Sequence, residues 1–202
     1  MRVALVNTKG GTGKTTSAMM LAEAARRRGY SSAVLDADPQ GSASEWAERA
    51  HAAGDPLPFE VDVANRATLE RKAASSEAEW LLIDSAPGDP AVIEAAVNVA
   101  DLTVIPTRST PADMDRALET YGAVDGPAAL LLWNISPRTQ LYRQARDLIA
   151  TEEIVALSAE IATREDVNKL WFTSLAYDLH GYEAVFDEIQ EALATTTGRT
   201  QR

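Results

Sequence analysis

The chain has 202 residues, of which 46% are hydrophobic, which is enough to bury one substantial core. It contains no cysteine, which excludes disulfides, thiolate metal sites, iron-sulfur clusters and cysteine nucleophiles. The formal net charge of -11 should repel phosphate backbones and anionic lipid on average, so any nucleic-acid contact must be local. The first residues lack the apolar stretch of a signal peptide, and no segment approaches the roughly 20 apolar residues that span a bilayer. We therefore expect a cytoplasmic protein.

Short β-branched runs alternate with longer helical stretches, which is typical of βαβ units. The pattern predicts an α/β fold with a mostly parallel, twisted sheet and helices on both faces. Strands are expected at residues 2–7, 33–36, 59–63, 80–84, 102–106 and 128–134, with a weaker strand at 154–157. Helices are expected at residues 15–28, 42–53, 65–75, 90–99, 111–124, 139–151, 164–171 and 182–193. We expect residues 1–194 to form one domain and residues 195–202 a frayed polar tail.

A glycine-rich loop joins the first strand to the first helix. Its glycines allow backbone N–H groups to turn inward around phosphate oxygens, and the helix that follows presents free N–H groups. Lys14 can reach the outer phosphates, and the hydroxyl of Thr15 can ligate Mg²⁺. The sequence therefore predicts a nucleotide phosphate site formed by Lys9, Gly10, Gly11, Thr12, Gly13, Lys14, Thr15 and Thr16.

Carboxylates follow two of the expected strands. Asp36 and Asp38 lie at the carboxyl end of the second strand, where ligands bind in such folds. Asp84 ends the apolar run that begins at Trp80, and a carboxylate in that position can hold Mg²⁺ through water, opposite Thr15. The sequence therefore predicts a metal site with Thr15 and Asp84.

These segments carry a resemblance to a known family. Residues 9–16 fit the deviant Walker A pattern KGGxGK[ST] of the ParA/MinD superfamily of P-loop ATPases, residues 36–42 resemble its DxDPQxS switch, and residues 84–88 resemble its DxxPG segment. The resemblance covers most of residues 2–135 and is loose beyond them. It implies the single-domain P-loop NTPase fold, with ATP and Mg²⁺ as cofactors. Ile105, Pro106, Thr107 and Asp113 match the family's segment after the second switch.

The resemblance also implies roles for individual residues. Lys9 would reach across a homodimer interface to the partner's phosphates, and Lys14 would bind phosphates within its own subunit. Asp38 would orient the hydrolytic water, and Asp36 would support the water shell of Mg²⁺. Asn134 occupies the place of an adenine contact, although an asparagine that caps the turn after the strand fits the sequence nearly as well.

The implied function is an ATPase switch that is slow by itself and stimulated by a partner, a centromere-binding or adaptor protein. Dimerisation on ATP and release on hydrolysis would segregate plasmid or chromosomal DNA, or position another intracellular cargo. The chain is closest to small ParA-type partition ATPases, which have no DNA-binding extension before the loop, and nucleoid association would follow. The alternatives are a positioning ATPase for a protein cargo without DNA binding, and a metabolic ATPase acting on a small molecule.

A membrane-bound relative would carry a basic amphipathic C-terminal helix. The expected last helix instead contains only acidic charges, at Glu183, Asp187, Glu188 and Glu191, so we expect no membrane binding. Arg26, Arg27 and Arg28 are expected to form a solvated helix end rather than a nucleic-acid patch. The tryptophans Trp46, Trp80, Trp133 and Trp171 are scattered, and we expect them to pack rather than to stack on bases.

Nonspecific DNA binding is a hypothesis that depends on three arginines. Arg143 and Arg146 lie three residues apart on the expected helix 139–151, and Arg138 stands at its entry. The alternative is a solvated helix whose arginines pair with Asp147, Glu152 or Glu153. Both readings stay open at the level of sequence.

Overall fold

The protein is an α/β structure with one seven-stranded parallel sheet. The computed structural model describes the backbone of residues 1–200 and the side chains of residues 1–167 and 169–195. The strand order is β3-β2-β4-β1-β5-β6-β7, and every pairing is parallel. The elements are β1 (Arg2–Leu5), α1 (Lys14–Arg27), β2 (Ser32–Ala37), α2 (Ser42–Ala52), β3 (Glu60–Val63), α3 (Leu69–Ser75), β4 (Trp80–Ser85), α4 (Pro90–Val99), β5 (Leu102–Thr107), α5 (Pro111–Ala123), β6 (Ala128–Ile135), α6 (Gln140–Thr151), β7 (Ile161–Ala162), the 3₁₀ helix η1 (Glu165–Leu170) and α7 (Tyr182–Thr200).

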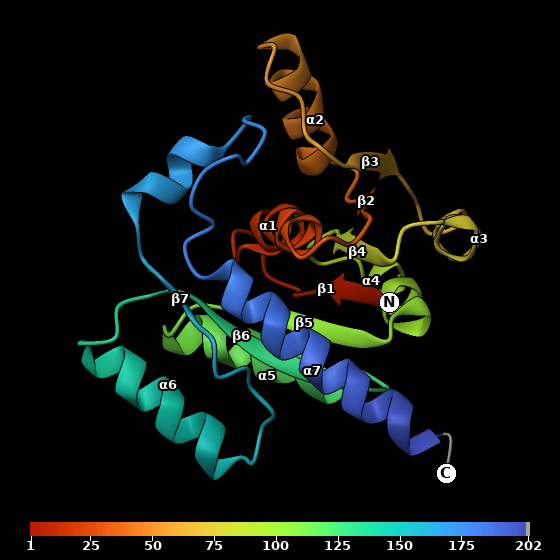
Figure 1. The fold of residues 1–202 in the computed structure, drawn as a ribbon. Coiled ribbons are helices and arrows are strands. Elements are labelled where there is room, and N and C mark those ends of the chain that lie inside the picture. Colours follow the sequence, from red (N-terminus) through yellow and green to blue (C-terminus); the bar gives the residue numbers. More distant parts are fainter. Residues whose placement is uncertain (201–202) are drawn as a thin grey trace.

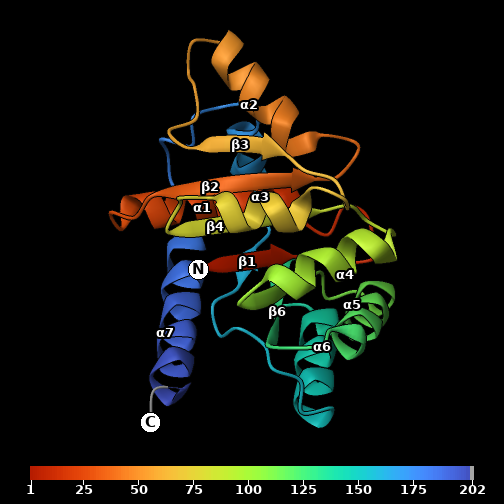
Figure 2. The same cartoon turned by 90° about the vertical axis from the view of Figure 1, so that its right-hand side faces the viewer.

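The sheet is covered on both faces (Figures 1 and 2). Successive residues in and directly after β1 contribute to opposite sides: Val3 and Leu5 join the core beneath α1 and α7, whereas Ala4 and Val6 join the core beneath α4, α5 and α6. This alternation is the period of two of a β-strand, and burial on both faces explains why the central strands are apolar throughout. The predicted fold class is therefore confirmed.

Local sequence signals explain where the helices begin and end. The carboxylate of Asp89 accepts hydrogen bonds from the first turn of α4, where Pro90 occupies a position that needs no donor. Thr110 caps α5 in the same way, ahead of Pro111. After α1, Gly29 adopts a left-handed conformation (φ 88°), and Tyr30 N–H returns to Ala25 carbonyl.

Four elements differ from the sequence prediction in type or by more than two residues. Helix α3 starts at Leu69 rather than at residue 65, because the Asn65 side chain accepts hydrogen bonds from Ala67 and Thr68 N–H and holds a turn. Residues 154–157 form no strand: only Ala156 makes a bridge, to Leu130, and the seventh strand is β7. The segment 164–171 contains a 3₁₀ helix, and α7 continues past residue 193 to Thr200.

The strand at 154–157 fails because the chain soon turns toward α7. Ser158 and Ala159 donate their backbone N–H groups to the carboxylate of Glu188, which draws this segment away from β6. The predicted polar tail comprises residues 195–202. Its backbone is helical to residue 200, and residues 201–202 lie outside the described part of the chain. Whether this end frays stays a prediction.

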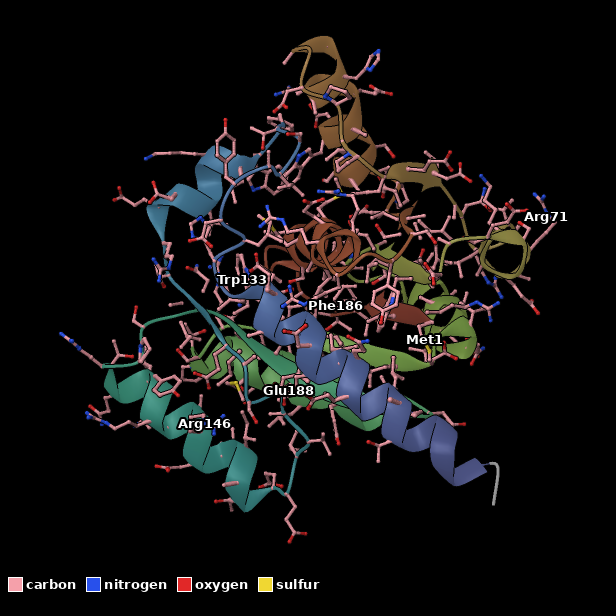
Figure 3. All side chains as sticks on the ribbon, viewed as in Figure 1. Met1, Arg71, Trp133, Arg146, Phe186 and Glu188 are labelled. Carbon is pink, nitrogen blue, oxygen red and sulfur yellow. The ribbon has the colours of Figure 1, made fainter. Side chains whose placement is uncertain are left out.

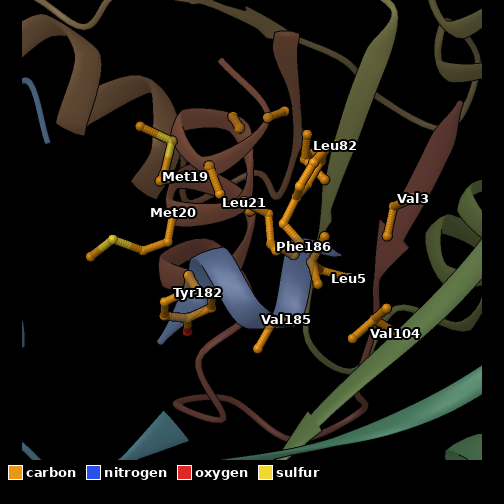
Figure 4. Packing of buried hydrophobic residues seen from close by; sticks show 14 of the residues in the cluster. Val3, Leu5, Met19, Met20, Leu21, Leu82, Val104, Tyr182, Val185 and Phe186 are labelled. Atoms are coloured by element: carbon orange, nitrogen blue, oxygen red, sulfur yellow. The ribbon is translucent and has the colours of Figure 1, made fainter. Parts of the chain in front are cut away.

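Helix α7 is an integral part of the core. Tyr182, Val185, Phe186 and Ile189 are buried against α1 and the sheet, and Figure 4 shows Tyr182, Val185 and Phe186 among the packed side chains. The apolar face of α7 is thus already used inside the protein. In the part of the chain that the structure describes, no helix is long and apolar enough to cross a membrane.

The arginines at the end of α1 attach this helix to α7. Arg27 donates to Glu183 at 2.9 Å, and Arg28 donates to Asp187 at 2.6 Å. Arg26 and Arg27 both also pair with the buried carboxylate of Glu23. Arg26 and Arg28 are exposed, in agreement with the predicted solvated helix end, and three carboxylates across α1 and α7 engage these cations in addition.

Candidate functional site

The site is a cavity of about 430 Å³ at the carboxyl edge of the sheet. The loop between β1 and α1 forms one wall, and Gly11 and Gly13 adopt positive φ angles of 70° and 96°, which side chains disfavour. Gly10, Gly11, Gly13, Lys14, Thr15 and Thr16, all of them predicted phosphate-site residues, line the cavity. Thr12 does not: it is buried, and its hydroxyl donates to the carbonyl of Lys9.

Lys14 is the cation inside the loop. Its side chain is 6% exposed, and its Nζ donates to the Lys9 carbonyl at 3.2 Å. Burial lowers the pKa of Lys14, and the nearby carboxylates of Asp84 and Asp38 oppose this shift. A buried cation held by a backbone carbonyl in this way is well placed to bind an anion that enters the cavity.

Lys9 does not line this cavity, although it directly precedes the glycines. Its Nζ forms an ion pair with Asp113 at the start of α5, at 2.6 Å. Burial by itself would raise the pKa of Asp113, but hydrogen bonds from Lys9 and Thr110 outweigh burial and hold that pKa below its usual value. The two lysines of the motif therefore point to different places.

Asp84 is a buried carboxyl group of the site whose oxygens make no hydrogen bond. It is the penultimate residue of β4, beside Asp36 of β2 in the strand register, and both of its carboxylate oxygens are buried without a hydrogen-bond partner. Burial raises the pKa of Asp84 to about 7, against the opposing effects of Thr15 and Lys14. Buried carboxylates without partners are costly, and a hydrated cation next to Thr15 would remove that cost. The residues present therefore fit Mg²⁺.

Asp36 has a structural task in addition to its predicted metal role. Its Oδ2 accepts hydrogen bonds from Ser44 N–H at 2.8 Å and from the Ser44 hydroxyl at 2.7 Å, and its Oδ1 accepts from Asp38 N–H. Asp36 thus holds the start of α2 and the turn that carries Asp38. Asp38 itself lines the cavity and accepts from Gln40 N–H at 2.9 Å.

Asn134 lies outside the phosphate cavity. It is the penultimate residue of β6, has a positive φ of 53° and lines a second cavity of about 320 Å³. This second cavity shares Arg108, Trp133 and Val167 with the first one. A nucleotide that reaches Asn134 from the phosphate loop must therefore pass these three residues, and the adenine contact stays a prediction.

Sequence reasoning missed Arg108 and assigned Trp133 to packing. The structure places both in the wall of the site, and Trp171 lines the first cavity as well. Trp46 and Trp80 are buried in the core as predicted, and the ring of Trp46 stacks on Trp171 at 4.7 Å. Only the position of Trp133 at the carboxyl end of its strand, next to Asn134, could have indicated a place in the site.

The three arginines proposed for DNA are near one another in sequence but are not equivalent. Arg146 lies on α6 (Figure 3), and it pairs with Glu160 at 3.1 Å rather than with Asp147, Glu152 or Glu153. Arg138 and Arg143 are exposed. Neither lines a cavity that touches the phosphate loop.

Comparison with known proteins places this geometry in a family. Residues 3–192 match the model of the CobQ/CobB/MinD/ParA nucleotide binding domain. The chain is 39% identical over 145 residues to the maintenance of carboxysome distribution protein A of Gloeobacter kilaueensis, an alignment that spans 68% of this chain and 64% of that protein.

Solved structures resemble the whole fold. The cell division ATPase MinD of Pyrococcus furiosus superposes with a TM-score of 0.74 at 17% identity, covering 95% of this chain and 99% of the other. A plasmid partition protein of Borrelia burgdorferi bound to AMPPNP superposes with a TM-score of 0.72 at 15% identity, covering 96% and 98%. With the loop, its glycines and the paired aspartates in place, this chain belongs to the CobQ/CobB/MinD/ParA family of nucleotide-binding domains.

Proposed function

We propose that this chain is a Mg-ATP-dependent switch of the ParA type: two subunits associate on ATP, hydrolysis separates them, and the cycle positions an intracellular cargo. A partner protein that links the cargo to the ATP dimer would stimulate hydrolysis. The observation that carries the proposal is the position of Lys9.

Lys9 is a cation of the loop that does not line the phosphate cavity of its own subunit. Lys14 is buried in that cavity, whereas Lys9 is 40% exposed and turned toward Asp113. A long side chain with three donors at the rim of the site is free to reach a phosphate presented by a second subunit once the ion pair opens. Residue type and placement thus support a site completed by dimerisation.

The remaining residues supply positioning and charge, which phosphoryl transfer chiefly requires. Lys14 and the loop N–H groups hold the phosphates, and Asp38, at the cavity wall, orients the attacking water. Thr15 and Asp84, with Asp36 behind them, would hold Mg²⁺. When bound, this ion neutralises phosphate charge.

The cargo is the least constrained part of the proposal. The 39% identical relative is a carboxysome-distribution protein, and one similar structure is a plasmid partition protein. A protein cargo is the better-supported choice here, because the net charge is -11 and one of the three candidate DNA-binding arginines already pairs with Glu160. Whether the dimer moves on DNA is a separate hypothesis, which the gel-shift experiment of the Discussion tests.

The dimer is tested with Lys9→Ala and a matched control, Lys72→Ala. Lys72 pairs with Asp62 and lies away from the nucleotide cavity. We expect Lys9→Ala to bind ATP and keep its fold but to remain monomeric by light scattering with ATP and Mg²⁺. The control should dimerise like the unmodified protein. A dimer of normal stability in Lys9→Ala would refute the cross-subunit role.

A further inference from the structure

Arg108 is a cation at the nucleotide site without an ion-pair partner among the described residues. It follows the last residue of β5 and lines both cavities. Its Nε is buried and makes no hydrogen bond, and its guanidinium lies over the ring of Trp133, with Cζ 5.4 Å from the centroid. The remaining acids and bases of the site have assigned tasks, but Arg108 has none.

Trp133 stands between Arg108 and the phosphate loop. A Cβ built on Gly13 would lie 2.5 Å from indole carbons of Trp133, so the indole packs directly on the loop backbone. Its Nε1 is buried and makes no hydrogen bond. The nearby hydroxyl of Tyr182 makes its hydrogen bond with Ser17 at 2.9 Å; burial raises the pKa of Tyr182, and Ser17 and the Trp133 N–H group oppose that rise.

Buried donors without acceptors are rare, because each loses its bond to water and gains nothing in return. Five buried polar side-chain atoms without a hydrogen-bond partner, donors and acceptors together, occur in the part of the chain that the structure describes. Two belong to Asp84, and two more are the N–H donors of Arg108 and Trp133. Four of the five therefore surround one site, where the Asp84 oxygens fit a cation and the two donors fit acceptor oxygens.

We propose that Arg108 and Trp133 bind the middle of the nucleotide, its α-phosphate and ribose. A nucleotide with its phosphates on the loop and its base in the second cavity must pass the wall that these residues share. The part that passes carries oxygen atoms, and the two N–H donors find their acceptors there. This inference rests on nucleotide binding at the loop and is independent of dimerisation and cargo.

The test is calorimetric titration of Mg-ADP and of Mg-ATPγS into Arg108→Ala. The matched control is Arg116→Ala, an exposed arginine on α5 that pairs only with Glu119. Because ADP and ATPγS share the α-phosphate and ribose, both should bind roughly 10-fold or more weakly to Arg108→Ala, as expected when a charged hydrogen bond is lost. Arg116→Ala should bind both within about twofold of the unmodified protein.

Two further variants separate binding from packing. Arg108→Lys keeps the charge but lacks the Nε donor and the planar fork, so its affinity should fall between those of Arg108→Ala and the unmodified protein. Trp133→Phe keeps an aromatic ring but removes the N–H donor together with part of the indole, so it should weaken both nucleotides roughly threefold or more. Melting curves of each variant without nucleotide verify that it is folded.

The outcomes are distinguishable. If the unmodified protein binds neither nucleotide, the proposed function fails as well. If it binds both and Arg108→Ala matches it within twofold, the inference alone is wrong. A loss confined to ATPγS would also overturn it, because that result assigns Arg108 to the γ-phosphate. Unchanged affinity in Trp133→Phe would return Trp133 to a packing role.

Discussion

The ion pair between Lys9 and Asp113 should restrain dimerisation, and Asp113→Asn should release that restraint. If Lys9 reaches the second subunit, its bond to Asp113 must break first, in both subunits. The substitution removes the charge but keeps the shape of the side chain. The pKa of Asp113 is lowered, so near neutral pH the carboxylate of the unmodified protein is charged and the restraint is fully present.

The magnitude follows from the exposure of the pair. Lys9 is 40% exposed and Asp113 only 6%, and the N···O distance is 2.6 Å. A half-exposed, charge-assisted pair of this kind contributes about 1 kcal/mol. Two pairs break per dimer, so Asp113→Asn should favour the ATP dimer by about 2 kcal/mol, which is roughly a 30-fold lower dissociation constant.

Sedimentation velocity with Mg-ATPγS over a range of protein concentrations measures that constant. Asp115→Asn is the matched control, since it is the same change at an exposed position on the same helix. The double variant Lys9→Ala with Asp113→Asn should show no gain, because the effect acts through Lys9. A dissociation constant for Asp113→Asn within twofold of the control, or a gain that persists without Lys9, would refute the reasoning.

Three further predictions concern other parts of the site. Asp38→Ala should bind ATP and accumulate as the dimer while turnover falls by roughly 30-fold, about 2 kcal/mol; turnover within about threefold of normal would exclude Asp38 as the water-orienting group. Asp84→Asn should lose the extra thermal stabilisation that Mg²⁺ adds to bound ATP, and EDTA should do the same to the unmodified protein; a melting temperature with Mg-ATP equal to that of the unmodified protein would argue against the metal site. If the ATP dimer binds DNA through α6, affinity in gel-shift titrations should fall with salt at a log-log slope of about -0.9 per phosphate neutralised, and Arg143→Ala with Arg146→Ala should reduce that slope. Binding that is unaffected by this double substitution, or absent at low salt, would favour a protein surface instead.

Most of the fold was predictable because its signals are local. Apolar runs, N-caps such as Asp89 and the glycine after α1 each act within a few residues, and they set the strands and most helix limits. The late start of α3 has a local cause, the turn held by Asn65, whereas the missed end of the strand at 154–157 depends on a distant partner. Residues 158 and 159 bind Glu188 of α7, and the pairing of residues 154–157 with β6 stops at the single bridge of Ala156. No local sequence pattern predicts a bond between residues about 30 positions apart.

The same distinction holds for the site. The sequence by itself determined the phosphate loop and the aspartates that follow β2 and β4, because their spacing and their place after strands already express the chemistry. Only the tertiary structure decided what each side chain contacts. Lys9 forms an ion pair with Asp113. The guanidinium of Arg108 lies over the ring of Trp133, which packs on Gly13, because parallel pairing brings the ends of β1, β5 and β6 to one edge of the sheet. Contacts between strand ends far apart in sequence depend on strand order, which no local pattern encodes.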